Sequence, residues 1–221
     1  MKRVIAFVDW FNMYHSIDNN LAPYYKWLDY RKLIQHFVKS DESLMKILFF
    51  TAQPRWDVNK LERHNNYIDI LSKTQNIDII AGNFTEKKQI FNLDKMPIIW
   101  PPVRIVKPKK FCYQTFEEKQ TDVNLALEIF EKWINNEYDV ALIFTGDSDI
   151  APAIHKVQKL HTGKKFRAIL PFNGEGRVIC STCRDYDKIT EKILYQYILP
   201  QEVNVFWRTV RCPYLYPEHL K

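Results

Sequence analysis

The chain alternates between short apolar runs and segments in which apolar residues recur at helical spacing. Continuous apolar runs predict strands at residues 4–8, 44–52, 77–81, 140–144 and 166–171. Helical spacing predicts helices at residues 30–38, 57–74, 121–133, 150–160 and 177–186, and a short edge strand is expected at 188–190. Strand–helix–strand alternation of this kind predicts an α/β fold, with a mostly parallel sheet and helices on both faces.

Residues 83–118 interrupt the alternation directly after Gly82, which we expect to end the third strand. Prolines in this insert exclude a regular helix, so we expect a β-hairpin or loop that stands off the sheet. Basic and aromatic residues are interleaved along it, which suits a surface that stacks bases and follows the phosphates of a single strand. On this interpretation Lys107, Lys109 and Lys110 contact phosphate. A solvated hairpin with a small aromatic core of its own explains the same composition.

Composition and charge change this picture only in part. The 221 residues are 46% hydrophobic, which fits one domain at 1–198 followed by an extension at 199–221 that packs on it. The net charge of +6 is compatible with a polyanionic partner. No apolar run approaches the roughly 20 residues that cross a bilayer, and Asp9 ends the N-terminal run too early for a secretion signal. We therefore expect a cytoplasmic protein with no membrane partner.

The four cysteines raise the question of a structural zinc ion. Cys180 and Cys183 have the spacing of a zinc-ligand pair, and Cys112 and Cys212 could complete a set of four. No second pair with that spacing exists, and residues one helical turn apart also suit two small buried hydrophobes. Disulfides are not expected in the cytoplasm. Burial is the favoured interpretation, and zinc stays open.

Acidic residues stand where predicted strands end and helices begin. The apolar run at 140–144 leads into Thr145-Gly146-Asp147-Ser148-Asp149, where Gly146 permits a sharp turn and Ser148 or Asp149 can cap the next helix. Asp9 ends the first strand, with Asn12 three residues later, and Asp122 lies at the start of a helix. The simplest interpretation is that these residues are caps and turn residues.

A second interpretation follows if the first and fourth strands are neighbours, because Asp9, Asp122, Asp147 and Asp149 then converge. Converging carboxylates need a cation or raised pKa values, and Mg²⁺ or Mn²⁺ is the cation that carboxylate oxygens bind. Beside a basic surface, such a site suits metal-assisted hydrolysis of phosphodiesters. The sequence contains no phosphate-binding glycine loop, nucleophile elbow or His-Glu-x-x-His motif that would indicate another chemistry.

Three segments together resemble the NYN branch of the PIN-like nucleases, and its short bacterial members above all. These segments are 7–12, 119–123 and 145–149, supported by a helix with Lys60, Arg63 and Tyr67 and by residues 199–203. The resemblance implies a PIN-like three-layer α/β/α sandwich and a Mg²⁺-dependent ribonuclease-type site. This chain departs from the family at Trp10, where glycine is usual, and the ring is expected to crowd the substrate path or to stack on a base. Of the cysteine pair that short members carry in the insert, this chain keeps Cys112.

The residues and the resemblance together lead us to expect a divalent-metal-dependent ribonuclease that acts on single-stranded or structured RNA. The expected metal ligands are Asp9, Asp122 and Asp147, with Asp149 binding directly or through water. Asn12 is expected to orient the substrate or a metal-bound water. Lys119, Thr145 and Ser148 are the expected phosphate contacts. The alternative is a non-catalytic RNA-binding or regulatory module. A third possibility is a phosphatase that acts on small nucleotides, but such an enzyme would need no basic insert. A homodimer is compatible with the sequence.

Overall fold

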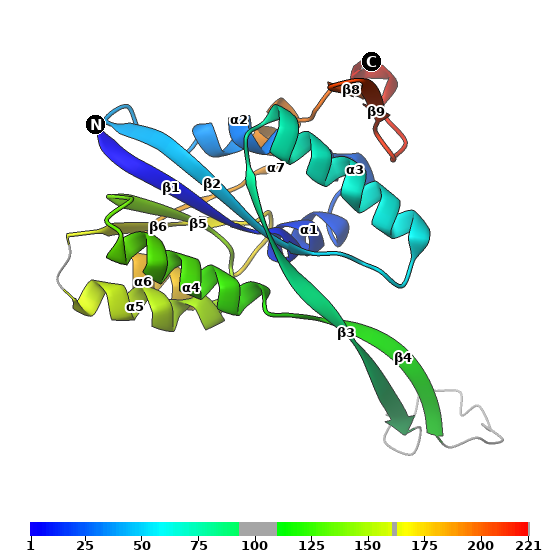
Figure 1. The fold of residues 1–221 in the computed structure, drawn as a ribbon, viewed down its shortest axis with the longest axis horizontal. Helices are drawn as coiled ribbons and strands as arrows, with labels where there is room; N and C mark the ends of the chain where they lie inside the picture. The colour runs from blue at the N-terminus through cyan, green and yellow to red at the C-terminus, as the bar shows by residue number, and fades with distance from the viewer. Residues whose placement is uncertain (93–109, 161–162, 221) are drawn as a thin grey trace.

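A seven-stranded sheet forms the centre of the fold, in the strand order β4-β3-β2-β1-β5-β6-β7 (Figure 1). The structure is a computed structural model that describes residues 1–92, 110–160 and 163–220. The strands are β1 (Lys2–Asp9), β2 (Glu42–Ala52), β3 (Asp78–Asn92), β4 (Lys110–Lys119), β5 (Val140–Phe144), β6 (Lys165–Leu170) and β7 (Asp185–Lys188). All neighbouring pairs are parallel except β3 and β4. The predicted α/β class and mostly parallel sheet are confirmed.

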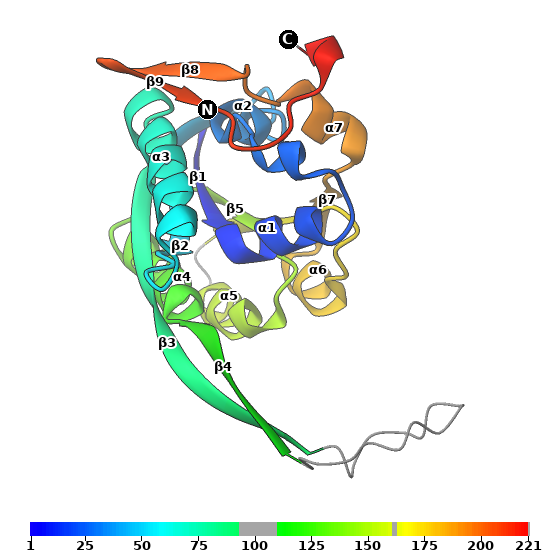
Figure 2. The same cartoon turned by 90° about the vertical axis from the view of Figure 1, so that its right-hand side faces the viewer.

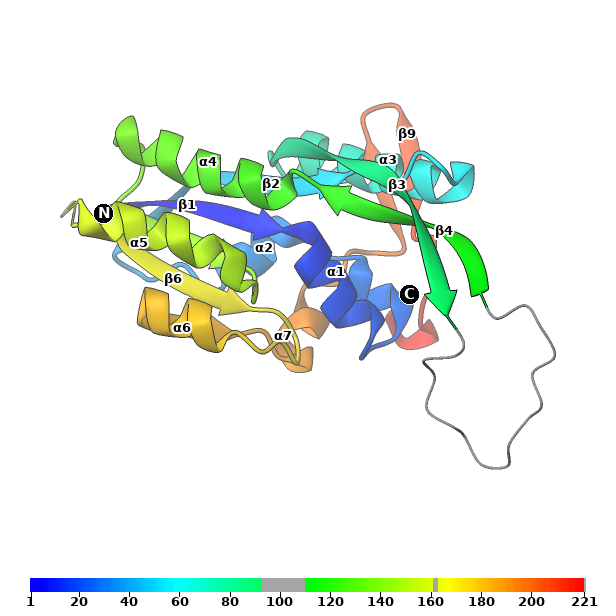
Figure 3. The ribbon, with the colours of Figure 1, turned by 90° about the horizontal axis from the view of Figure 1, so that it is seen from below.

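Helices cover both faces of the sheet, because the central strands are apolar on both sides. In β1, Val4, Ala6 and Val8 belong to one core, whereas Ile5 and Phe7 belong to the other. Helices α1 (Trp10–Asp18), α2 (Tyr30–Gln35), α3 (Val58–Thr74) and α7 (Glu191–Gln196) pack on the first face, and α4 (Thr121–Ile134), α5 (Ala151–Lys159) and α6 (Arg177–Cys183) on the second. Figures 2 and 3 show the resulting three layers. This confirms the predicted α/β/α sandwich.

The insert forms an arm that projects from the sheet (Figure 1). Strand β3 continues past Gly82 and pairs with β4 in an antiparallel ladder from Asn83 opposite Lys119 to Asn92 opposite Lys110. The predicted hairpin is confirmed, but the expectation that Gly82 ends the strand is wrong. A Cβ atom at Gly82 would lie 2.6 Å from Thr121 Oγ1 and 2.7 Å from the carbonyl oxygen of Lys119. The glycine therefore permits close packing of β3 on the start of α4.

Three further expectations about the second half of the chain are wrong in detail. Helix α6 ends at Cys183 instead of residue 186, because Arg184 adopts a left-handed conformation with φ of 62°. The edge strand therefore begins at Asp185, earlier than residue 188. Helix α5 ends at Lys159, and Leu160 is 48% exposed although its spacing predicted a core position.

The C-terminal segment packs against the face that carries α1, α2 and α3. Strands β8 (Glu202–Val205) and β9 (Arg208–Arg211) form a separate antiparallel hairpin, followed by a short 3-10 turn at Glu218–Leu220. Val205, Val210 and Tyr216 are buried in the core on that face. The indole nitrogen of Trp27 donates a 2.8 Å hydrogen bond to the carbonyl oxygen of Pro200. Residues 199–220 thus add side chains to the core of the domain.

The cysteines do not gather into a zinc site in the part of the chain that the structure describes. Cys183 is buried in the core beneath α6, and Cys212 is buried in the core on the opposite face of the sheet. Cys112 is exposed on the arm. The pair in α6 is thus explained by one residue that packs in the core and one, Cys180, that lies at its edge.

Candidate active site

Asp9 lies at the carboxyl end of β1 and at the first turn of α1. It is the N-cap of α1, where one carboxylate oxygen accepts a 3.1 Å hydrogen bond from the backbone N–H of Asn12. The other oxygen accepts a 2.8 Å bond from the Thr145 hydroxyl. Only 4% of the residue is exposed. The capping interpretation of Asp9 therefore accounts for one oxygen, and a neighbouring strand supplies the partner of the other.

The loop after β5 lies beside Asp9 because β1 and β5 are adjacent parallel strands. Thr145 is fully buried, and its hydroxyl also accepts a 3.0 Å bond from the backbone N–H of Asp147. The Asn12 side-chain oxygen accepts a 2.9 Å bond from the backbone N–H of Gly146. A Cβ atom at Gly146 would lie 2.9 Å from the carbonyl oxygen of Glu175, so the turn needs glycine. These bonds fix the loop against the start of α1.

Asp147 caps the turn that leads into α5. Its carboxylate accepts a 2.9 Å bond from the backbone N–H of Asp149, at the start of a 3-10 turn at Ser148–Ile150. The expectation that Ser148 or Asp149 supplies this cap is wrong, because the turn begins one residue earlier. Ser148 and Asp149 are exposed beside it.

Asp122 lies in the first turn of α4, which begins where β4 ends. Gln120, between the strand and the helix, has a left-handed backbone with φ of 77°. Glu118 accepts a 3.0 Å bond from the backbone N–H of Thr121 and a bond from its hydroxyl, so it caps this helix from the end of the arm. We did not anticipate Glu118 from the sequence, because its position beside Asp122 depends on the chain reversal at Gln120.

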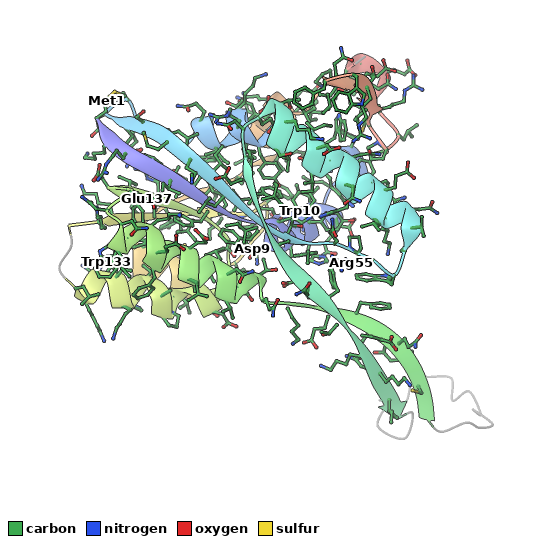
Figure 4. The ribbon with its side chains drawn as sticks, viewed as in Figure 1. Met1, Asp9, Trp10, Arg55, Trp133 and Glu137 are labelled. Carbon is green, nitrogen blue, oxygen red and sulfur yellow. The ribbon has the colours of Figure 1, made fainter. Side chains whose placement is uncertain are left out.

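The pKa values indicate that these acids lie close to one another. Burial, followed by the charges of Asp122 and Asp147, raises the pKa of Asp9 to about 6, although the bonds from Asn12 and Thr145 oppose the rise. Burial also raises the pKa of Asp122 to about 6, and the charged groups that add to it are Asp147, Glu118 and Asp149. Within the described residues, the charged groups that shift the pKa of Asp122 are thus acidic. Figure 4 shows Asp9 and Trp10 near the centre of the molecule.

The donor set fits a hard divalent cation, because it consists of carboxylates, and neighbouring acids oppose the ionisation of two of them, Asp9 and Asp122. Among the described residues, no three histidine, cysteine or acidic side chains lie close enough to form a ready-made set of ligands. Asp9 is held by two hydrogen bonds, whereas Asp149 is exposed at the surface. A cation would therefore have to draw the more exposed acids towards Asp9.

The remaining predicted contacts fall into different environments. Lys119 is exposed and lies 3.0 Å from the carboxylate of Glu117. Thr145 is buried and bonded to both sides of the site, which makes it a residue that positions Asp9 and Asp147. Lys107 and Lys109 lie outside the described residues, and so does the side chain of Lys110.

An aromatic cavity of about 520 Å³ is lined by Trp10, which follows Asp9 in the chain, and by Glu118, and the sequence did not predict it. Trp10 lines it while packing against Tyr14, Tyr30, Phe49 and Tyr67, and only 7% of the tryptophan is exposed. The departure from the family's usual glycine thus fills part of the core beside α1. Aromatic residues after two strand ends, at 10–11 and at 56, were the available signal in the sequence.

The three-layer sandwich with acids at the carboxyl ends of its strands is the arrangement of a PIN-like domain. The chain belongs to the NYN domain family, whose family model matches residues 3–190. The predicted family is therefore confirmed. None of the helices that the structure describes has both the length and the apolarity that a bilayer span requires.

Two individual proteins are similar to this chain. One is the 6-hydroxy-3-succinoylpyridine 3-monooxygenase HspA of Pseudomonas putida (strain DSM 28022 / S16), 27% identical over 200 residues. The match covers 79% of this chain and 61% of that relative, so this chain spans less than two thirds of its length. The other is the crystal structure of a protein of unknown function from Vibrio parahaemolyticus RIMD 2210633, with a TM-score of 0.53 and 12% identity. That match covers 90% of this chain and 96% of the other, and it supports the fold alone.

Proposed function

We propose that the protein is a divalent-metal-dependent ribonuclease that hydrolyses phosphodiester bonds in RNA. The observation that carries the proposal is the meeting of acids at the carboxyl ends of β1 and β5 and the start of α4, where neighbouring acidic charges raise the pKa values of Asp9 and Asp122. Carboxyl groups whose ionisation is opposed, as at Asp9 and Asp122, gain most from a bound Mg²⁺ or Mn²⁺ ion. Membership of the NYN family supports RNA as the substrate class.

In this mechanism the side chains of the chain hold and orient the reacting groups. Asp9, Asp122 and Asp147 would bind the cation, and Asp149 would join them directly or through water. A bound divalent ion supplies an activated water and offsets the charge that develops on the phosphate oxygens. Asn12 anchors the Gly146 turn through its oxygen, which leaves its amide group to orient the substrate or the water. Lys119 and Ser148 are exposed beside the acids, where we assign them to phosphate, and Lys107, Lys109 and Lys110 to phosphates further along the strand.

The test is incubation of the pure protein with labelled single-stranded RNA in Mg²⁺, Mn²⁺ or EDTA. We expect cleavage with either metal and none in EDTA. Asp147→Asn should reduce cleavage by orders of magnitude, whereas Asp78→Asn, an exposed acid paired with Lys46 at the start of β3, should not. Cleavage that persists in EDTA would contradict the metal mechanism. Metal-independent RNA binding without cleavage would instead support the non-catalytic RNA-binding module.

A second candidate function is monooxygenation of a small pyridine acid, the activity that the name of the Pseudomonas relative states. The aromatic cavity beside the acids favours it, because a cavity of this kind suits a planar ring. This function requires oxygen and a reductant, so oxygen uptake that depends on the pyridine substrate would support it. The partial overlap with the relative and the uncompensated acids make the ribonuclease the stronger candidate.

A further inference from the structure

The aromatic cavity lies between α1, α3, the base of the arm and the C-terminal segment. Its walls are mainly aromatic, and a volume of about 520 Å³ falls within the range of small-molecule sites. The aromatic residues that matter here are Trp10, Phe11, Trp56, Phe84, Phe116 and Tyr214. They come from four different parts of the chain, so the cavity exists only when the sheet, the arm and the C-terminal segment are packed together.

Trp56 offers the accessible aromatic surface of this cavity. Its ring stacks on Phe116 with centroids 4.2 Å apart and an interplanar angle of 2°, and Phe84 meets it edge-on at 4.4 Å. In spite of these contacts 38% of Trp56 is exposed. A stacked aromatic pair held by a third ring is a rigid platform, and planar heteroaromatic rings bind to such platforms by extending the stack.

Helix α3 places cationic and polar groups at the same cavity. Lys60, Arg63 and His64 line it from one side of the helix. Within the part of the chain that the structure describes, Arg63 forms no ion pair with an acidic side chain. Its charge opposes the rise that burial causes in the pKa of Tyr214, which also lines the cavity. Burial lowers the pKa of His64 to about 4, so the ring is neutral at pH 7 and offers one hydrogen-bond donor and one acceptor.

Lys26 also lines the cavity, but its charge is taken up by contacts within the protein. Its ammonium group is bonded to Asp18, and it lies 4.3 Å from the centroid of the Tyr14 ring. Only 5% of Lys26 is exposed. The positive charge available to a ligand therefore comes from Arg63 and from Lys60, which is exposed and lies 4.0 Å from the carboxylate of Asp57.

Two residues connect the cavity to the acids. Trp10 lines the cavity and directly follows Asp9 in the chain. Glu118 also lines the cavity, and its negative charge contributes to the raised pKa of Asp122. A ring bound in the cavity would therefore contact a neighbour of Asp9 in the chain and an acid whose charge raises the pKa of Asp122, and an anionic group attached to that ring would be attracted to the cations of α3.

We propose that this cavity binds the base of one nucleotide of the RNA, stacked on Trp56, with an adjoining phosphate near Lys60 and Arg63. The inference rests on the proposed ribonuclease function, whose substrate it describes in more detail. A pyridine acid has the same chemistry of a planar ring with an anionic group, so the experiment must distinguish the two sources. Binding of one base beside the acids would place a single phosphodiester bond at the site.

Tryptophan fluorescence tests this binding directly, because Trp10, Trp27 and Trp56 all line the cavity. The protein in EDTA is titrated separately with the four ribonucleoside 5′-monophosphates and with 6-hydroxynicotinate as a pyridine acid. We expect saturable quenching by at least one nucleotide and much weaker binding of the pyridine acid. Because EDTA removes the metal, the measurement does not depend on catalysis.

Two substitutions with matched controls localise the binding. Trp56→Ala should weaken nucleotide binding roughly 5- to 100-fold, the range expected for loss of one stacking contact. The control is Trp207→Ala, at a tryptophan that is 88% exposed on the C-terminal hairpin, and it should leave the affinity unchanged. Arg63→Gln should weaken nucleotide binding several-fold, whereas Lys159→Gln at the end of α5 should not. Circular dichroism checks that the Trp56→Ala variant is folded. If that variant does not fold, Arg63→Gln still tests the site.

The outcomes separate this inference from the proposed function. If no nucleotide quenches, or if the pyridine acid alone binds, the inference about the base is wrong, and RNA cleavage decides the function independently. Quenching that neither Trp56→Ala nor Arg63→Gln weakens would place the binding elsewhere and also overturn it. If nucleotides bind as expected but RNA is not cleaved, the base site stands and the ribonuclease proposal fails.

Discussion

At the scale of single residues, one buried hydroxyl connects the two sides of the candidate site. Thr145 donates to Asp9 and accepts from the backbone of Asp147, so it sets the relative position of two acids that come from different strands. Neither acid is a free surface carboxylate, because each also caps a helical turn. Capping and metal binding are thus compatible roles for the same side chains, since each carboxylate oxygen has two lone pairs and one hydrogen bond leaves the second lone pair available.

Thr145→Val removes this hydroxyl while keeping the shape of the side chain. We expect a loss of about 1–3 kcal/mol in the free energy of unfolding, since the buried Asp9 oxygen and the Asp147 N–H lose their partner. Cleavage should fall by about tenfold or more. Thr145→Ser keeps the hydroxyl and is the control. Denaturant unfolding and the RNA assay measure the two effects, and equal behaviour of Val and Ser would contradict the positioning role.

The raised pKa of Asp9 predicts a pH dependence of stability. A carboxyl whose pKa is higher in the folded state binds more protons there than in the unfolded chain, so its ionisation destabilises the fold as the pH rises. A rise from 3.8 to about 6 corresponds to up to about 3 kcal/mol, lost between pH 4 and 7. In EDTA, Asp9→Asn should therefore gain stability relative to the wild type over this interval.

Unfolding of both proteins by urea across this pH range measures the difference. Mg²⁺ should stabilise the wild type more at pH 7 than at pH 5, because the ionised carboxylates bind the metal. If the free energies of unfolding of Asp9→Asn and the wild type changed in parallel with pH, ionisation of the Asp9 carboxyl would not destabilise the fold, which would contradict the prediction.

At the scale of elements, the sequence predicted what depends on burial alone. The runs that became β1 and β5 are apolar at every position and were identified with nearly correct bounds. The continuation of β3 beyond Gly82 was not predictable. Glycine is needed there because Thr121, 39 positions further along the chain, leaves no space for a side chain. The acids were found since they stand at element ends. Glu118 and the aromatic cavity were missed, because both depend on how the arm packs.

Gly82→Ala tests the close packing between β3 and α4. The added Cβ atom would meet Thr121 Oγ1 and a backbone oxygen closer than real Cβ atoms do, so we expect destabilisation of about 1–3 kcal/mol. Cleavage should fall as well, because the displaced helix carries Asp122. The control is Gly163→Ala, which has open space but a φ of 68° and should cost about 1 kcal/mol without affecting cleavage. Unfolding and cleavage assays of both variants provide the comparison.

At the scale of the whole molecule, a buried ion pair joins two strands that are not neighbours in the sheet. Arg167 on β6 lies 2.8 Å from Glu42, the first residue of β2. Arg167 also lies 3.0 Å from Asp185, the first residue of the adjacent strand β7. The side chains of Arg167 and Glu42 are each only 3% exposed. Burial alone would raise the pKa of Glu42, but the bonds from Arg167 hold it below its usual value. This contact stabilises the sandwich and contributes no group to the acid site.

Arg167→Met should therefore destabilise the protein by about 3–5 kcal/mol, because Glu42 would remain buried without a partner. The double variant Arg167→Met with Glu42→Gln should recover much of this loss. Arg211→Met, which removes an exposed pair with Glu202, should change stability by less than about 1 kcal/mol. Urea unfolding of the three variants measures these differences. A single variant as mild as Arg211→Met would mean that water solvates Glu42 when the arginine is absent.

The pairing of β1 with β5 also decides when the site first exists during synthesis. Asp9 and Thr145 are 136 positions apart, and contacts of such long range form late because a long loop must close first. On the ribosome, Asp9 and Asp122 emerge first, and the full set of four acids cannot form until the chain has been made to Asp149 and β5 has docked beside β1. A ribonuclease of the kind proposed above, assembled in this order, would stay inert towards the message that encodes it until most of its own sequence had been translated.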